Sequence, residues 1–275
     1  MPVPSILLAP VPFSEAIADR AVRSLLPTSL SSSDLMKLSP EIRRRAVFSA
    51  RVTDATHLST LDRLIGQIIT PSGVPGEYMN EPRARELLRA HLDETGWQPA
   101  EGEAGRITDL RSTQRVRLQL NMGVGLANGY GQAVLSNDPD VLDSFPGWRF
   151  LPSFADDPRP DSYWLGRWQS AGLPGPFGSD YVALKGDPGW SRLSVFGTPY
   201  PPFAWNSMRQ VEDVERSTCE SYGLLQPGST PPAIPLQDRR PLTASIPEPA
   251  PDLLSAILDA FSAAKFTNGI LSALS

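Results

Sequence analysis

Cysteine and histidine are nearly missing from this sequence. Its 275 residues include one cysteine, Cys219, and two histidines, His57 and His91. A single thiol cannot form a disulfide within the chain, so nothing in the sequence points to an oxidising compartment. Three such residues are also too few for a four-ligand Cys/His zinc site. Any metal site would need carboxylates, and we predict neither a metal, nor a cofactor, nor a catalytic residue.

Long apolar runs and an excess of basic charge are also absent. No apolar segment approaches the roughly 20 residues needed to cross a bilayer, so we expect no membrane segment and a protein that is soluble in the cytoplasm when made. Residues 1–12 are apolar but broken by Pro10 and Pro12, which predicts an extended arm. The net charge of −5 argues against broad nucleic-acid binding, because phosphate neutralisation requires clustered Lys and Arg.

Aromatic residues are distributed unevenly along the chain. Of the 22 Phe, Trp and Tyr residues, 15 lie between Phe145 and Tyr222. This imbalance predicts two regions: a mainly helical region over 13–144, and a small irregular module of helices and strands over 145–225. The fold class that we predict is therefore α+β.

Apolar spacing in the first region is helical, and proline and glycine mark where helices begin and end. One of the predicted helices is long, with Thr108 or Asp109 as its N-cap and an apolar residue at every fourth position from Leu118 to Val134. The shorter helices are predicted over 13–25, 41–53, 54–69 and 82–95.

Gly125 and Gly129 lie four residues apart within the long helix. Together with Gly123 they resemble a dinucleotide-binding fingerprint, but that mechanism requires the glycines at the N-terminus of a helix. Glycine in a helix interior costs roughly 1 kcal/mol relative to alanine, so close packing is the expected compensation. We predict that both glycines face a neighbouring backbone.

The aromatic module is interrupted by proline or glycine every few residues. Strands are predicted over 181–185 and 193–196, and short helices near 163–170 and 213–222. Residues 226–251 are predicted to form a proline-rich linker, because 8 of the 25 residues from 227 to 251 are proline. Residues 252–275 are predicted to form an amphipathic helix and a tail.

Three segments are candidate partner surfaces. The densest basic cluster, Arg43–Arg45, is either a solvated helix face or a contact for DNA or an acidic partner. The string Pro199–Ser207 is stiff and aromatic, and either binds a partner or packs on the module's own core. The last helix is marginal alone in water and needs a surface to dock on. The candidate residues are Arg43, Arg44, Arg45, Phe203, Trp205, Leu254, Ile257 and Phe261.

Acidic residues gather in two places. Asp156, Asp157 and Asp161 lie near Trp164 and Trp168, which suggests a carbohydrate-active or carbohydrate-binding site, or a site for a divalent cation. The alternative is a proline-rich surface turn with solvated acids. Downstream, three further acids are expected to complement the dipole of the predicted helix at 213–222 from its first turn. These are Glu212, Asp213 and Glu215.

Several strings, in order along residues 12–225, resemble the phage minor head proteins of the Mu F-like type, also called phage head morphogenesis proteins. The strings are Pro12–Ile17, Leu26–Thr28, Arg45–Arg51, Gly105–Ser112, Arg117–Asn121, Ala127–Gln132, Pro146–Phe150, Pro201–Ser207, Val211–Arg216 and Tyr222–Leu225. Many members of the family also carry a downstream Arg…His stretch and a Cys-Arg-Cys-like end. Here no histidine follows His91, and Cys219 stands alone.

The resemblance implies a non-enzymatic role in the assembly of a tailed phage or prophage. The implied place of action is the head interior or the portal vicinity of the virion, and the host cytoplasm during assembly. The implied partners are the portal protein and, in addition, the major capsid or scaffold protein. The competing hypothesis is the carbohydrate-active protein suggested by the acidic loop. Contact with DNA through the arginine cluster is a third hypothesis, against which the acidic pI of about 5.2 argues.

Overall fold

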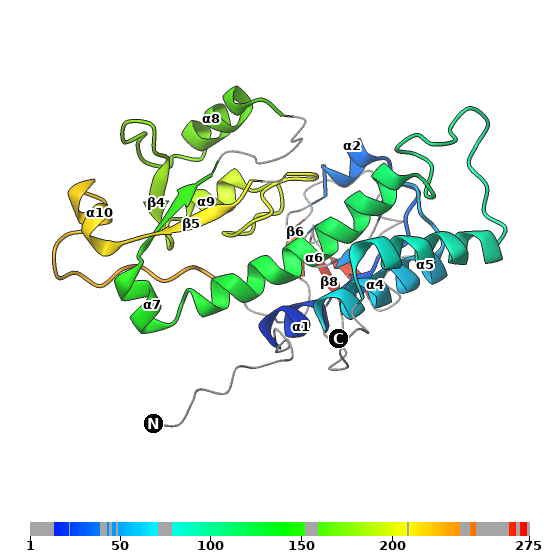
Figure 1. Ribbon diagram of the computed structural model, residues 1–275, viewed down its shortest axis with the longest axis horizontal. Helices are drawn as coiled ribbons and strands as arrows, with labels where there is room; N and C mark the ends of the chain where they lie inside the picture. Colours follow the sequence, from blue (N-terminus) through cyan, green and yellow to red (C-terminus); the bar gives the residue numbers. More distant parts are fainter. Residues whose placement is uncertain are drawn as a thin grey trace.

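The protein is α+β, as its sequence predicts (Figure 1). The structure is a computed structural model that describes residues 14–21, 23–38, 43, 46–47, 49–70, 79–151, 159–207, 209–236, 243–245, 264–267 and 270–273. Its described helices are α1 (Ser14–Ala21), α2 (Ser32–Leu35), α4 (Ala55–Ile69), α5 (Glu81–Glu94), α6 (Thr113–Leu135), α7 (Pro139–Ser144), α8 (Asp161–Ser170), α9 (Gly189–Leu193) and α10 (Arg216–Ser221). Its strands are β1 (Ser24–Leu25), β2 (Ala46–Val47), β3 (Gly147–Phe150), β4 (Val182–Leu184), β5 (Val211–Val214), β6 (Thr243–Ser245), β7 (Ala264–Thr267) and β8 (Ile270–Ala273).

Helices α4 and α5 confirm the predictions over 54–69 and 82–95. Each begins at a side chain that accepts a backbone N–H: Asp54 from Thr56 in α4, and Asn80 from Arg83 in α5. Their apolar stripes meet α6 in a shared core that includes Leu61, Leu64, Leu88, Val116 and Leu120. The amphipathic spacing therefore determines both the helices and the face that each one buries.

Helix α6 is the spine of the molecule and runs between its two halves (Figure 1). Its N-cap is Ser112, whose hydroxyl accepts from the backbone N–H of Arg115, and not Thr108 or Asp109 as predicted. Asp109 instead accepts backbone N–H groups within the preceding turns. The first turns of α6 pack on α4 and α5, and its later turns pack on the aromatic module.

The predicted helices over 13–25 and 41–53 are wrong in part. Helix α1 ends at Ala21, and β1 follows it to pair in parallel with β2. Backbone groups explain the difference, because Leu26 donates to the carbonyl of Val47 and Thr28 donates to that of Val52. A two-residue strand carries no sequence periodicity, so the tertiary pairing overrides the local helical pattern.

The aromatic module is built on a three-stranded antiparallel sheet in the order β4-β3-β5. Strand β4 confirms the strand predicted over 181–185, and α8 confirms the helix predicted near 163–170. Aromatic rings fill the core with edge-on and tilted contacts, for example 5.3 Å between the ring centroids of Trp168 and Trp190. The fully buried members of this core include Trp164, Trp190, Phe196 and Phe203.

Two predictions in the module are wrong. Residues 193–196 do not form a strand, because Asp187 accepts the backbone N–H of Gly189 at 2.7 Å and the following residues form α9. The predicted helix over 213–222 is divided between β5 and α10. Strand β5 exists because it completes the register of β3, opposite Gly147–Phe150. Glu212 and Asp213 therefore lie in a strand, and Glu215 is the N-cap of α10 without a side-chain hydrogen bond.

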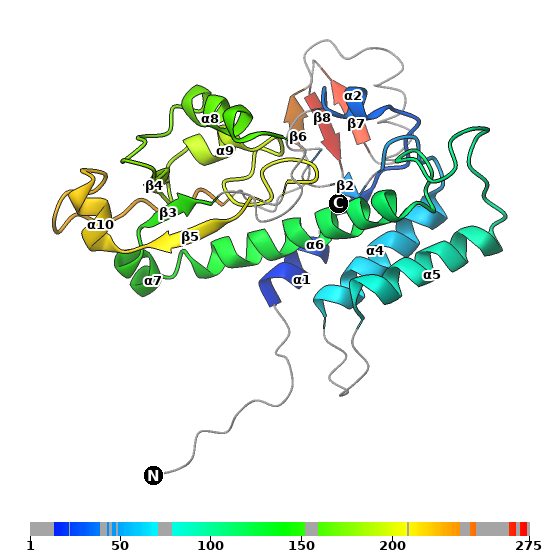
Figure 2. The same ribbon diagram turned by 45° about the horizontal axis from the view of Figure 1, so that its top comes forward.

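A second three-stranded sheet, in the order β6-β8-β7, lies on the same side of α6 as α2 (Figure 2). Strand β6 falls within the predicted proline-rich linker, and the described part of the predicted tail forms β7 and β8. The predicted amphipathic helix near 252–261 and the predicted arm over 1–12 lie outside the described residues. Within the described part of the chain, no helix combines the length and the apolar character that a bilayer crossing requires.

Candidate functional site

A cavity of about 210 Å³ lies between α6 and the segments that include α1, α2, β2 and α4. One wall is apolar and comes mostly from α4 and α6. The rest of the lining carries an unusual number of guanidinium groups for one cavity, from Arg20, Arg23, Arg43 and Arg115. The apolar lining includes Leu61, Ile65, Leu118, Met122 and Leu126.

Helix α6 places both kinds of group on one face. Arg115, Gln119, Met122 and Leu126 follow one another at intervals of four, three and four residues, which brings them onto a single stripe. Ser49 meets this stripe from the segment after β2: its hydroxyl accepts from Gln119 Nε2 at 2.8 Å and from Arg115 Nη2. Arg115 also donates to the carbonyl of Ala50 at 2.7 Å.

The lining is electropositive. Its four arginines and one aspartate give a formal charge of +3. The aspartate, Asp62, forms an ion pair with Arg20, with 2.6 Å between Asp62 Oδ2 and Arg20 Nη2. Burial lowers the pKa of Arg115 because the charged guanidinium is removed from water. The cavity therefore offers positive charge against an apolar wall, which suits an anionic ligand with an apolar part.

Sequence reasoning missed Arg115, Gln119 and Ser49 as site residues. The signal that could have found them is the polar pair at positions 115 and 119, on the side of a long helix that also carries Met122 and Leu126. A buried arginine and glutamine four residues apart on such a face need hydrogen-bond partners from other segments of the chain or from a ligand.

The arginine cluster does not form the predicted solvated surface at Arg43. This side chain is buried, lines the cavity, and has its Nη1 at 3.7 Å from Met36 Sδ. Arg44 and Arg45 lie outside the described side chains. The helical pattern that placed Arg43 in solvent is interrupted by β2, which turns this segment towards α6.

Phe203 is wrong as a partner surface. Its side chain is fully buried in the aromatic core and stacks on Trp190 with 5.7 Å between ring centroids. Trp205 is partly buried, contacts Phe196 edge-on and borders the arginine-lined cavity. The string Pro199–Ser207 therefore packs on the module's own core, the other interpretation of its sequence. The remaining candidates, Leu254, Ile257 and Phe261, lie outside the described residues.

The acidic loop is not assembled around exposed tryptophans. Trp164 and Trp168 are buried, and Trp168 Nε1 donates to the carbonyl of Pro174 at 2.9 Å. Asp161 forms an ion pair with Arg209, while Asp156 and Asp157 lie outside the described residues. Buried indoles cannot stack on a sugar, so the carbohydrate hypothesis lacks its aromatic platform at these two positions. Among the described residues, no three His, Cys, Asp or Glu side chains gather as metal ligands would.

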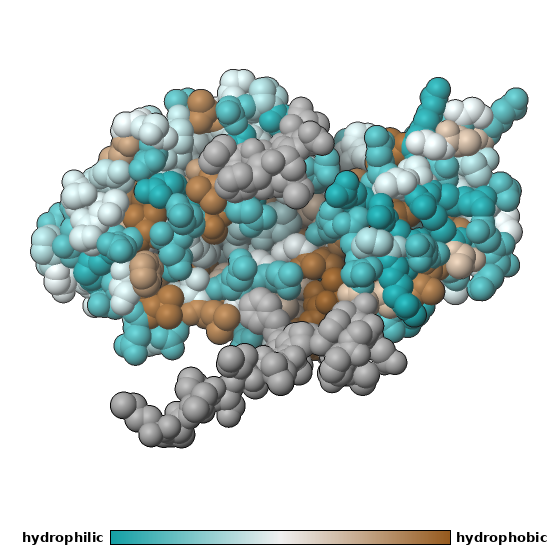
Figure 3. Space-filling view, viewed as in Figure 1, coloured by the Kyte–Doolittle hydropathy of each residue, from teal (hydrophilic) through white to brown (hydrophobic). Residues whose placement is uncertain are grey.

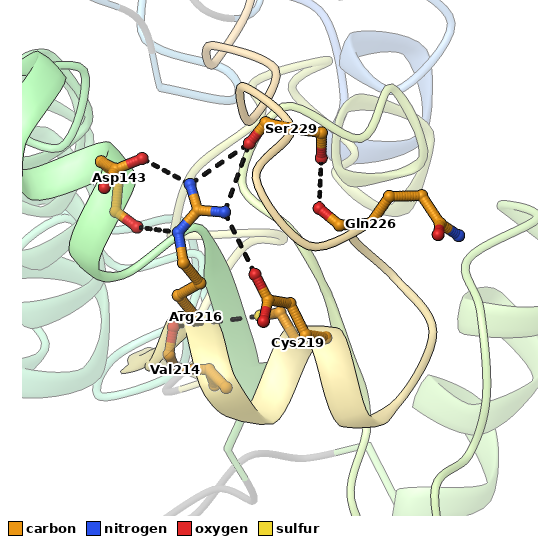
Figure 4. A network of polar contacts seen from close by, with 7 residues as sticks. Asp143, Val214, Arg216, Cys219, Gln226 and Ser229 are labelled. Atoms are coloured by element: carbon orange, nitrogen blue, oxygen red, sulfur yellow. Dashed lines mark hydrogen bonds and ion pairs between the residues drawn. The ribbon is translucent and has the colours of Figure 1, made fainter.

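Arg216 connects α10 with α7 and with the segment around Ser229 (Figure 4). Its Nε donates to the carbonyl of Asp143 at 3.0 Å, its Nη1 to the carbonyl of Ser229 at 3.2 Å, and it forms ion pairs with Asp143 and Glu220. Cys219 lies beside this network with its thiol buried, and burial raises its pKa to about 11. The thiol is therefore protonated at neutral pH and is a poor nucleophile.

Comparison of the chain with protein-family models, with curated proteins and with solved structures finds no match.

The two histidines lie side by side, His57 on α4 and His91 on α5. The rings of His57 and His91 stack with 6.1 Å between centroids, and His57 is fully buried with neither ring nitrogen hydrogen-bonded to a described residue. The pKa of His57 is lowered to about 4, chiefly by burial, with the charges of His91 and Arg115 acting in the same direction and Asp54 opposing them. His57 is therefore neutral in the folded protein at neutral pH.

This buried histidine predicts an acid-sensitive stability. His57 takes up a proton near the ordinary histidine pKa of 6.5 in the unfolded chain, but only near 4 in the folded chain. The free energy of unfolding is therefore highest above pH 6.5 as far as His57 is concerned, and it falls as the pH is lowered from 6.5 to 4. The loss is up to about 3 kcal/mol. A His57→Phe variant, which keeps a ring but cannot titrate, should lose this part of the slope in urea unfolding measured between pH 4 and 7. Equal slopes in both proteins would contradict the assignment.

Proposed function

We propose that this chain is a structural protein of tailed-phage or prophage assembly: a minor head protein that acts at or near the portal in head morphogenesis and DNA packaging. The observation that supports the proposal most is spatial. Strings that resemble the minor head family are far apart in the sequence, yet they contact one another in pairs in the fold.

Three such pairs meet. Ser49, in the string Arg45–Arg51, is hydrogen-bonded to Gln119, in the string Arg117–Asn121. A Cβ added to Gly129, in the string Ala127–Gln132, would lie 1.9 Å from the carbonyl oxygen of Pro201 in the string Pro201–Ser207. The strings Pro146–Phe150 and Val211–Arg216 contain the paired strands β3 and β5. Strings that meet in this way are parts of one folded unit, as the segments of a single family domain would be.

The end of α6 and the adjoining α7 offer a surface for the portal. Of the seven exposed large hydrophobic residues in the described part of the chain, three fall within 135–145: Leu135, Val141 and Phe145. Their side chains expose 53%, 37% and 38% of their area. Hydrophobic groups are visible at the α7 end of a mostly hydrophilic face (Figure 3). Clustered exposed apolar residues are typical of protein–protein contacts.

Co-expression with the portal protein of the same locus tests the proposal. We expect the two proteins to co-purify, and the chain to be present in purified particles. A Val141→Ser/Phe145→Ser variant should reduce the recovered portal about tenfold, because apolar anchors carry most of the affinity of an interface.

A Leu87→Ser variant is the matched control, because Leu87 is as exposed (39%) but lies on α5 in the other half of the molecule. Its recovery of portal should equal that of the wild type. Absence of association, together with absence from particles, would refute the proposed function. Association that both variants leave unchanged would refute only the surface.

A further inference from the structure

Two buried polar atoms on α6, Arg115 Nε and Gln119 Oε1, belong to side chains that line the arginine-lined cavity and have no hydrogen-bond partner within the described part of the chain. Both side chains are more than nine-tenths buried, at 7% and 8% exposed. Their other polar groups are held by Ser49 and Ala50, so both side chains are fixed in place. Buried polar groups are almost always satisfied in native proteins, so these two atoms are where a ligand in the cavity would form hydrogen bonds.

Arg115 supplies an uncompensated positive charge. No carboxylate among the described residues forms an ion pair with it, and the one aspartate in the lining, Asp62, is already bound by Arg20. Its guanidinium donates through Nη2 to Ser49 and Ala50, while its Nε has no hydrogen-bond partner among the described residues. An anionic ligand would compensate this charge, and a carboxylate oxygen can accept from Nε in one charge-assisted hydrogen bond.

Gln119 needs a hydrogen-bond donor from the ligand, whereas Arg115 needs an acceptor. Its Nε2 donates to Ser49, and its Oε1 is an acceptor without a donor. A carboxylate has no hydrogen to donate, so the anion bound to Arg115 cannot also satisfy this oxygen. The two side chains lie four residues apart on α6 and share Ser49, so the ligand must carry an N–H or O–H donor close to its carboxylate.

The remaining wall is apolar, so the ligand also needs an apolar group. Leu61, Ile65, Met122 and Leu126 face the cavity. A cavity of about 150 Å³ lined by such side chains holds a benzene molecule, and this one has about 210 Å³ and opens to the surface. A branched aliphatic or small aromatic side chain fits this space.

We propose that this cavity binds the carboxyl-terminal residue of a peptide that ends in an apolar side chain. The terminal carboxylate accepts from Arg115 Nε, the backbone N–H of the same residue donates to Gln119 Oε1, and the side chain packs on the α4–α6 wall. One residue thus supplies the anion, the donor and the apolar body in the arrangement that the cavity requires. The assignment rests on the cavity alone and holds whatever assembly the chain serves.

N-acetyl-leucine is the probe, since it carries all three groups. We expect it to bind the full chain in titration calorimetry and to raise the Tm. N-acetyl-leucinamide lacks the carboxylate, and 4-methylpentanoate lacks the amide N–H; each should bind at least tenfold more weakly. Equal binding of the leucinamide would overturn the role of Arg115, and binding of inorganic phosphate as tight as that of N-acetyl-leucine would overturn the assignment to a peptide terminus.

Variants on α6 provide the second measurement. Arg115→Gln should reduce the affinity for N-acetyl-leucine at least tenfold. Arg117→Gln is the matched control, because its guanidinium is two residues away, 63% exposed and outside the cavity lining, and it should leave binding unchanged. Retained affinity in a folded Arg115→Gln protein would refute the proposal. If that variant fails to fold, the comparison of the three leucine-like probes on the wild type decides.

Discussion

An Asp213→Ala variant is expected to be less stable than the wild type by about 2–3 kcal/mol. Lys185 is the reason. Its side chain is fully buried, its Nζ lies 2.8 Å from Asp213 Oδ1, and it has no other hydrogen-bond acceptor among the described residues. Removing the carboxylate strands a cation 5.8 Å from the ring of Trp148, inside the aromatic core. The loss is smaller than for a fully enclosed pair because the Asp213 side chain is 45% exposed.

Two companion variants separate charge from hydrogen bonding. Asp213 also accepts from Trp148 Nε1 at 3.0 Å, and Asp213→Asn keeps an acceptor there while removing the charge. A Lys185→Met/Asp213→Ala double variant removes both charges and should recover much of the loss, since methionine fills the same space without a cation. The measurement is guanidinium unfolding followed by tryptophan fluorescence. A double variant no more stable than Asp213→Ala would contradict a stranded charge.

The long helices could be predicted from the sequence because they are specified locally. An apolar stripe, a capping side chain and a breaking residue are enough to define α4 or α5, and each of these signals lies within a few residues of the helix itself. The strand β4 was also predictable, because its neighbours mark turns on either side. In contrast, β1, β2 and β3 exist only through partners 22 or more residues away, which no local pattern contains.

The functional side chains were less predictable than the helices. Arg43 and Phe203 were placed on a surface by composition, yet both are buried by contacts with segments distant in the sequence. The same long-range packing brings Ser49 to Gln119, 70 residues away. Composition indicates which residues can carry charge or bind a ring; only the fold decides which of them share a cavity.

A Gly129→Ala variant is expected to be destabilised by about 2–3 kcal/mol, although alanine is the better helix former by about 1 kcal/mol. The added Cβ would lie 1.9 Å from the carbonyl oxygen of Pro201 and 3.0 Å from Tyr200 Cδ2. A backbone carbonyl cannot rotate away as a side chain can, so α6 and the segment 200–202 must separate. That movement would open the edge contact between Tyr130 and Tyr200, whose ring centroids are 6.0 Å apart.

Gly125→Ala is the matched control one turn earlier on α6. Its Cβ would meet only the ring of Pro202, at 3.5 Å, which is ordinary van der Waals contact. This part of the sequence prediction is therefore corrected: Gly129 faces a neighbouring backbone, while Gly125 faces a side chain. Gly125→Ala should be neutral or more stable by up to about 1 kcal/mol in urea unfolding. If both variants gained stability alike, the glycines would be dispensable for close packing, and α6 would tolerate alanine wherever it meets the aromatic module.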